Sequence, residues 1–168
     1  MTQYLLDANI FIQAKNLHYG FDFCPAFWEW LIAKNHEEVV FSLDKVADEL
    51  ESGGDDLSDW AKAREDGFFL KPDDAVLPAL TTVSTWAMGQ NYEQAAVSTF
   101  LQVADYWLVA QALAHGLVIV THEVPSDSAK KVKIPNACVG LQVRCMSPYE
   151  MLRRERARFV LGPAARTQ

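Results

Sequence analysis

Short runs of apolar residues alternate along the chain with longer segments whose apolar positions recur at helical spacing. The apolar runs at 4–6, 38–42, 68–70, 117–120 and 143–146 predict short strands or extended segments. The run LVIV at 117–120 is continuous and rich in β-branched residues, which is typical of a strand buried on both faces of a parallel sheet. Strands that alternate with helices in this way predict an α/β fold built from parallel βαβ units.

Helices are expected between these strands, and several are bounded by residues that favour helix ends. Ser42 is predicted to begin a helix that stops before Gly53, and Gly116 is predicted to end another. Pro135 is expected to start a short helix, and Ser147 to cap the last one. The other expected helices span 23–34, 56–66, 74–88 and 93–115 (as one helix or two), and the last one runs through MLRRERARF, residues 151–159.

The chain of 168 residues is long enough for one well-buried core. We expect a single domain over 1–161, followed by a flexible tail at 162–168. No apolar run approaches the roughly 18 residues that a membrane span needs, and the first residues lack the features of a secretory signal. The cysteines Cys24, Cys138 and Cys145 are too widely spaced to predict a CxxC metal site or a disulfide framework. We therefore expect a cytoplasmic protein with reduced thiols and no membrane contact.

The formal net charge of −7 is distributed unevenly along the sequence. Residues 1–123 carry a net charge of −13, whereas residues 124–168 carry +6. One interpretation is that the two surfaces neutralise each other across the fold. The other is that the basic part forms a patch that binds phosphate groups. The sequence leaves both interpretations open, although the overall acidity argues against a nucleic-acid partner.

Several carboxylates stand among apolar residues rather than in charged stretches. Asp7 directly follows the first expected strand, and Glu123 follows the LVIV strand in the string LVIVTHE. Asp105 lies near the start of the helix that leads into LVIV, and Asp48 and Glu49 lie on the helix after the second strand. Because ligands of open parallel sheets bind outside the carboxyl ends of the strands, Asp7 and Glu123 are expected to face one crevice.

Clustered carboxylates raise one another's pKa unless a cation neutralises them. Hard divalent cations such as Mg²⁺ and Mn²⁺ prefer oxygen ligands, so the pattern predicts an acidic metal site. The alternative for Asp7 is that it caps the helix that follows it. The residues alone take the prediction no further than an acidic divalent-metal site in an α/β domain.

Four strings occur in order along the chain: YLLDANIFI, KVADEL, ADYWLVAQALAHG and VIVTHE. In this order and at this spacing they resemble the PIN domain family, whose members carry a strand followed by Asp-x-Asn, an internal Glu followed by Leu, an Ala-Asp before an Ala-rich helix, and a strand ending in Thr-x-Asp. The resemblance extends from Tyr4 to about Phe159. The segments FDFCPAFWEWL, KVKIPNACV and SPYEMLRR are similar to one branch of prokaryotic PIN-like proteins. The resemblance implies a three-layer α-β-α fold with a central parallel sheet of four to five strands.

The resemblance also implies which acids form the site. Asp7, Glu49 and Asp105 match the acidic core of the family, and Glu123 stands where most members have Asp. These four residues would be the catalytic residues and would bind one or two Mg²⁺ or Mn²⁺ ions. The longer side chain of Glu123 would reach a metal either directly or through water.

The second acidic position has two rival candidates, Asp48 and Asp44. Glu49 is preferred because Leu50 follows it, as in the family pattern. The resemblance further implies that Asn9 and Thr121 order the site by hydrogen bonding.

The resemblance also implies a metal-dependent endoribonuclease that hydrolyses RNA phosphodiester bonds and leaves a 5′-phosphate and a 3′-hydroxyl. Many small stand-alone PIN proteins are toxins that a cognate antitoxin holds inactive, and they often form homodimers. An antitoxin and a second copy of the chain are therefore expected partners beside the RNA substrate. The alternative is a catalytically silent PIN-like module that binds RNA or protein, for which the departure at Glu123 leaves room.

The basic residues after Glu123 are candidates for holding a polyanion near an acidic site. Lys130, Lys131 and Lys133 are predicted to contact flanking RNA phosphates. The arginines at 153–158 favour a solvated helix face instead. His122 is expected to face away from Glu123, since adjacent strand residues point to opposite faces. The aromatic residues between 19 and 30 are expected in the core or a subunit interface rather than stacked on bases.

Overall fold

A computed structural model describes residues 1–64 and 66–162 of the chain. Its centre is a five-stranded sheet in which every strand pair is parallel, with the strand order β3-β2-β1-β4-β5. The predicted α/β class and the predicted parallel sheet are therefore confirmed. The strands are β1 (Tyr4–Leu6), β2 (Val40–Leu43), β3 (Phe69–Leu70), β4 (Val118–Val120) and β5 (Cys145–Met146).

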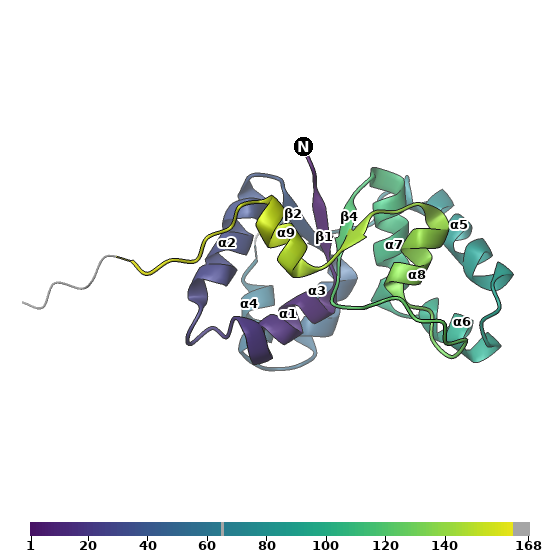
Figure 1. Ribbon diagram of the computed structural model, residues 1–168, viewed down its shortest axis with the longest axis horizontal. Helices are drawn as coiled ribbons and strands as arrows, with labels where there is room; N and C mark the ends of the chain where they lie inside the picture. Colours follow the sequence, from purple (N-terminus) through teal and green to yellow (C-terminus); the bar gives the residue numbers. More distant parts are fainter. Residues whose placement is uncertain (65, 163–168) are drawn as a thin grey trace, which may run out of the picture.

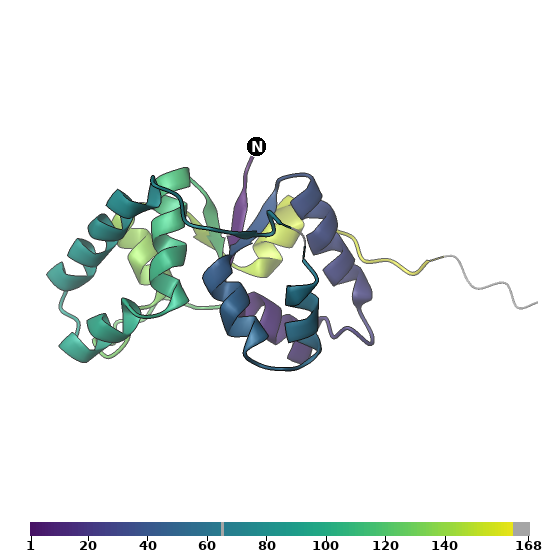
Figure 2. The same cartoon turned by 180° about the vertical axis from the view of Figure 1, so that it is seen from behind.

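Helices flank this sheet in two groups, which Figure 1 shows on either side of β1 and β4. Figure 2 shows the same two groups from behind. The first group comprises α1 (Ala8–Gln13), the π-helix η1 (Ala14–His18), α2 (Pro25–His36), α3 (Asp44–Glu51), α4 (Asp56–Lys62) and α9 (Pro148–Arg154). The second group comprises α5 (Val76–Gly89), α6 (Gln94–Phe100), α7 (Ala104–His115) and α8 (Ile134–Leu141).

Strand β1 occupies the middle of the sheet although it comes first in the chain. It pairs with β2 on one side, with Leu5 beside Phe41, and with β4 on the other, with Leu6 beside Val120. The chain builds outward from β1 to β2 and β3, and then returns to add β4 and β5 on the opposite side. This reversal creates a topological switch point between β1 and β4, which is where open parallel sheets place their ligands.

The core follows from the apolar strands. Leu5, Leu6, Ile119 and Val120 are completely buried, as a strand covered on both faces requires. An aromatic group fills the space under the first group of helices, with rings in tilted, stacked or edge-to-face contact. It includes Phe11, Trp28, Trp60, Phe68 and Phe27. For Phe27 and Trp28 the predicted core placement is confirmed.

The structure shortens one predicted helix, divides another and adds a helical segment after Asp7. The prediction over 56–66 is too long, because α4 ends at Lys62 and the chain must return to β3; residue 65 lies outside the described residues. The segment 93–115 forms two helices, the second of the two alternatives, because Val103 has an extended backbone between α6 and α7. Residues 8–18, which lie outside the predicted helix ranges, form α1 and η1 directly after Asp7.

The last helix ends at Arg154, earlier than the predicted end at 159. Arg156 adopts a left-handed conformation with φ of 54°, and the amide of Ala157 donates to the carbonyl of Leu152 at 2.9 Å. This closure ends the helix and turns the chain, so that the ring of Phe159 packs near aromatic residues of the first helix group. Of the predicted tail at 162–168, residues 163–168 lie outside the described residues.

The prediction that Ser42 begins a helix is wrong. Ser42 is the third residue of β2, it is completely buried, and its amide donates to the carbonyl of Phe68 at 2.9 Å. Its hydroxyl donates to the carbonyl of Leu6 at 2.6 Å, so the polar side chain is satisfied inside the sheet. The helix begins two residues later, at Asp44.

Within the described residues, no helix is both long enough and apolar enough to cross a membrane.

Replacing Gly116 with Ala is expected to lower the free energy of unfolding by ~1 kcal/mol. Gly116 ends α7 in a left-handed conformation with φ of 67°, which a side chain disfavours, and no neighbouring atom would compensate. Urea unfolding followed by circular dichroism measures the change. The matched control is Gly89→Ala at the end of α5, where φ is not left-handed and no clash arises. An equal loss in both variants would contradict this explanation.

Candidate active site

The site forms where β1 and β4 end side by side. The register that places Leu6 beside Val120 continues for one residue, because the amide of Asp7 donates to the carbonyl of Val120 at 3.0 Å. Asp7 therefore lies next to Thr121, the first residue after β4. The pairing of two apolar strands thus fixes a carboxylate and a hydroxyl at the carboxyl edge of the sheet.

Thr121 is the centre of a hydrogen-bond network. Its hydroxyl donates to Oδ2 of Asp7 at 2.7 Å and accepts from Nδ2 of Asn9 at 3.3 Å and from the amide of Glu123 at 3.0 Å. Oδ1 of Asn9 in turn accepts from the amide of His122 at 3.2 Å. Asn9 and Thr121, the two residues predicted to order the site, are joined here to Asp7 in one network.

Asp7 occupies the N-cap position of α1, but its side chain makes no capping hydrogen bond. The side chain is turned to Thr121 instead, which removes the support for the alternative that Asp7 is there to cap the helix. Asp7 is only 5% exposed, and this burial raises the pKa of its carboxyl to about 7. The negative charges of Asp105 and Glu123 contribute to this rise, whereas the hydrogen bond from Thr121 opposes it.

Asp105 lies in the first turn of α7 and is half-buried. Burial is the largest cause that raises the pKa of its carboxyl to about 6, followed by the negative charge of Glu123. Glu49 also raises this pKa, whereas the ammonium group of Lys131 lowers it. Asp105 therefore shares one electrostatic environment with three other acids, including Asp7.

The position of Glu49 separates it from its rivals. Glu49 lies exposed on α3, and its charge acts on Asp105 across the site. Asp44 instead accepts a hydrogen bond at 2.7 Å from the amide of Lys45, its neighbour in the first turn of the helix. Asp48 is exposed on the same helix. The structure thus brings Glu49 into the electrostatic environment of the acids at the ends of β1 and β4.

Glu123 makes contacts that the sequence did not predict. Its Oε2 accepts from the amide of Ile134, the first residue of α8, at 2.8 Å, and its Oε1 accepts from Nζ of Lys131 at 3.4 Å. The side chain is only 12% exposed. The carboxylate of Glu123 therefore accepts a hydrogen bond from a backbone amide at the N-terminus of α8, although Glu123 lies outside that helix. The sequence does not predict this contact, because Glu123 lies eleven positions before Ile134 in the chain.

Lys131 supplies a positive charge inside the acidic site. Burial alone would lower the pKa of its ammonium group, but the carboxylates of Glu123 and Asp105 outweigh this effect, so the pKa is raised. The side chain of Lys131 is 58% exposed, so it can rotate away from Glu123 without disturbing the core. Of the other predicted lysines, Lys130 lines the same pocket as Asp105, and Lys133 acts on Asp105 by its charge.

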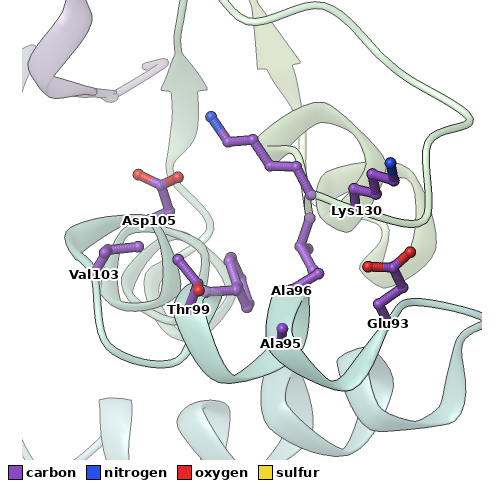
Figure 3. A pocket seen from close by; sticks show the side chains of 10 residues that line it. Glu93, Ala95, Ala96, Thr99, Val103, Asp105 and Lys130 are labelled. Atoms are coloured by element: carbon purple, nitrogen blue, oxygen red, sulfur yellow. The ribbon is translucent and has the colours of Figure 1, made fainter.

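A pocket of about 270 Å³ opens beside Asp105. Figure 3 shows Asp105 at one end of it and Glu93 at the other, with Lys130 above and short side chains of α6 below. The pocket therefore connects the acidic site with a surface that carries both charged and apolar groups.

Three rings form a cluster on another side of the acids. His18 stacks on His122 with ring centroids 5.4 Å apart, and Tyr149 contacts both rings at 5.8 and 5.9 Å. The hydroxyl of Tyr149 lies 3.2 Å from Nε2 of His18. Burial, and then the charge of His18, lower the pKa of His122. His122 and Glu123 thus contact different elements, and the cluster itself could not be foreseen because its members come from η1, the segment after β4, and α9.

The donor set suits a hard divalent cation, because every candidate ligand is a carboxylate. A buried carboxylate with one hydrogen bond from a side chain, as in Asp7, also favours a nearby cation. Within residues 1–64 and 66–162, no three His, Cys, Asp or Glu side chains lie close enough to share one ion as they stand. Binding would therefore require side-chain rotation, which the exposed Glu49 can undergo. Glu123 fits least well, because both of its oxygens are already engaged.

A family model described as "Domain of unknown function (DUF4411)" matches residues 4–159. The structure entitled "Crystal Structure of FitAcB from Neisseria gonorrhoeae" matches with a TM-score of 0.53 and 17% sequence identity, over 88% of this chain and 99% of that chain. No curated protein matches. At this identity the structural match shows the fold alone, and the architecture is the PIN-like α/β fold that the sequence resemblance predicts.

Replacing Asp7 with Asn is expected to stabilise the metal-free protein at pH 8 by about 1–3 kcal/mol. The pKa of Asp7 is about 7 in the folded protein against 3.8 ordinarily, so the folded state holds the proton more tightly than the unfolded state. The stability that Asp7 contributes is therefore complete below pH 3.8, declines as the pH rises to about 7, and stays low above it.

The measurement is urea unfolding of both proteins in EDTA at pH 4.5 and pH 8. The gain from Asp7→Asn should be much larger at pH 8 than at pH 4.5. Asp48→Asn, a change at an exposed position, should alter stability little at either pH. A gain that does not depend on pH would show that burial of the charge at Asp7 is not the cause.

Proposed function

The chain belongs to the DUF4411 family, a domain of unknown function, and we propose that it is a metal-dependent endoribonuclease. The observation that carries the proposal is the buried carboxylate of Asp7, whose pKa is raised by the nearby Asp105 and Glu123 as well as by burial. A group of acids held together at a sheet's switch point is unfavourable without a cation. The PIN-like fold supports the same conclusion.

Asp7, Asp105 and Glu49 would hold one or two Mg²⁺ or Mn²⁺ ions, with Glu123 as a fourth acid of the site. When bound, such ions lower the pKa of a water molecule and stabilise negative charge on the phosphate oxygens. The hydrogen bonds of Asn9 and Thr121 would hold the carboxylate of Asp7 in position to bind these ions.

Two further roles fall to residues at the pocket. Asp105 borders the pocket, so its carboxylate would be placed to assist in removing a proton from the attacking water. Lys131 pairs with Glu123 while no other cation is present, and would turn to a substrate phosphate once the acids are neutralised. Hydrolysis would leave a 5′-phosphate and a 3′-hydroxyl on the RNA.

A catalytically silent module that binds RNA or protein is the second candidate function. The observation that favours it is the engagement of both oxygens of Glu123 by Ile134 and Lys131. In this alternative Glu123 is a structural residue and Lys131 replaces the metal as the cation of the site. The acids would then be retained for their role in folding.

The proposal extends to the partners of the protein. We propose that a cognate antitoxin and a second copy of this chain are its protein partners, which would make it the toxin of a toxin–antitoxin pair. Induced expression in a bacterial host tests this directly. Growth arrest by the wild type but not by Asp7→Asn would support the toxin role.

Purified wild-type protein is expected to cleave a mixed pool of structured RNAs in Mn²⁺ or Mg²⁺ and to lose this activity in EDTA. Asp7→Asn and Asp105→Asn are each expected to reduce cleavage by more than about 100-fold, since loss of an outer partner of a metal ligand already costs 10–100-fold. Gel electrophoresis of labelled RNA measures the rates. Calorimetric titration with Mn²⁺ on the same samples separates metal binding from an unmet sequence preference.

The silent-module alternative would be established by RNA binding without cleavage and without Mn²⁺ binding. If neither Mn²⁺ nor Mg²⁺ bound to the wild type, the metal-site proposal would be wrong whatever the RNA result.

Glu49→Gln is expected to weaken Mn²⁺ binding by at least about tenfold, whereas Asp48→Asn should leave it within twofold. Both residues are exposed on α3, and the negative charge of Glu49 contributes to the raised pKa of Asp105. The pair is matched in helix and exposure, so general effects on α3 cancel. A larger loss in Asp48→Asn would reassign the second acidic position.

A further inference from the structure

We propose that the pocket beside Asp105 binds the base and ribose of one unstacked nucleotide, the neighbour of the scissile phosphate in single-stranded RNA. This inference rests on the proposed function and assigns a substrate subsite to it. One wall of the pocket comes from α6, and the other from the segment that contains Lys130, Lys131 and Val132.

The wall from α6 suits the flat face of a base. It presents Ala95, Ala96 and Thr99, short side chains that leave room, and Phe100 and Val103 also line the pocket. Val103 is 39% exposed, so the pocket keeps apolar surface in contact with water. A base that packs against this wall would remove the apolar surface from water, which favours binding. Such a contact does not depend on which base is bound, so it is compatible with many RNA sequences.

Charges at the two ends of the pocket give the nucleotide a direction. Lys131 lines the pocket together with Asp105 and reaches Glu123 in the acidic site. Lys130 lies on the side of Glu93, at the other end of the pocket, as Figure 3 shows. The carboxylate of Glu93 repels a phosphate but can accept hydrogen bonds from the ring N–H or amino groups of a base. The phosphate is therefore directed toward the acids and the base toward Glu93.

The pocket size and construction fit a single nucleoside. A volume of about 270 Å³ lies just below the roughly 300–1,000 Å³ of pockets that hold drug-sized ligands. The two walls are tied together, because the amide of Glu93 donates to the carbonyl of Ala129 at 2.9 Å. Bases that can enter such a pocket are unpaired and unstacked, which favours a single strand or a loop over a duplex.

The test fills the pocket without changing a charge. Thr99→Leu adds bulk at an exposed position of α6 that lines the pocket. The matched control is Ser98→Leu, on the same helix but facing a different groove with Tyr92 and Leu101. Each variant is assayed on RNA and on bis(p-nitrophenyl) phosphate, a phosphodiester without a nucleoside. Melting temperatures verify that both variants fold.

Thr99→Leu is expected to lower kcat/KM for RNA by about tenfold or more, the loss expected when one stacked base is excluded. Its hydrolysis of bis(p-nitrophenyl) phosphate should remain within twofold of the wild type, and Ser98→Leu should match the wild type on both substrates. Equal losses on both substrates would overturn the proposal, because the variant would then disturb the acids rather than a nucleotide. An unchanged RNA rate would also overturn it.

A second measurement keeps the subsite separate from the nuclease proposal. Binding of a fluorescent single-stranded RNA is followed by anisotropy in the Asp7→Asn background, where cleavage is removed. If the wild type cleaves neither substrate, the proposed function fails, yet weaker RNA binding in Thr99→Leu and not in Ser98→Leu still supports the pocket. Equal affinities, or no RNA binding, overturn the pocket assignment. Lys130→Gln should reduce the slope of log Kd against log salt by about 0.7, as loss of one phosphate contact on a single strand requires.

Discussion

The burial of one negative charge, on Asp7, is the constraint on which the rest of the site depends. The pairing of β1 with β4 holds this carboxylate at the edge of the core, where only 5% of the residue is exposed. Thr121 supplies one strong hydrogen bond, which lessens the unfavourable energy without removing it. A buried carboxylate of this kind favours the binding of a positive charge beside it. A proton, an ammonium group or a metal ion can provide that charge.

Glu123 and Lys131 form the second fixed part of the site. The carboxylate of Glu123 is held by the amide of Ile134 at the start of α8 and by the ammonium group of Lys131. The segment between β4 and α8 is thereby fixed at both ends, because Thr121 holds the amide of Glu123. The same segment forms one wall of the pocket, so the geometry of the pocket and the electrostatics of the acids are set together.

Much of the fold was predictable because its causes are local. The continuous apolar run LVIV indicates a strand buried on both faces, and carboxylates at the ends of two such strands must share an edge of a parallel sheet. The role of Ser42 inside β2 was not predictable, since its hydroxyl bonds to Leu6, 36 positions away. The contact between Glu123 and Ile134 and the ring cluster around His122 were missed for the same reason: each depends on how separate segments meet in space.

The strand order also determines when during synthesis the site can exist. Asp7 is synthesised long before the hydroxyl that holds it, because Thr121 lies 114 positions later in the chain and α8 follows later still. A growing chain therefore carries the first acid long before the others can join it, and long-range parallel pairing of this kind forms late. An incomplete chain that is still attached to the ribosome and its messenger RNA would lack an assembled acidic centre. The order of strands thus delays the assembly of the acidic centre until β4 and α8 have both been synthesised.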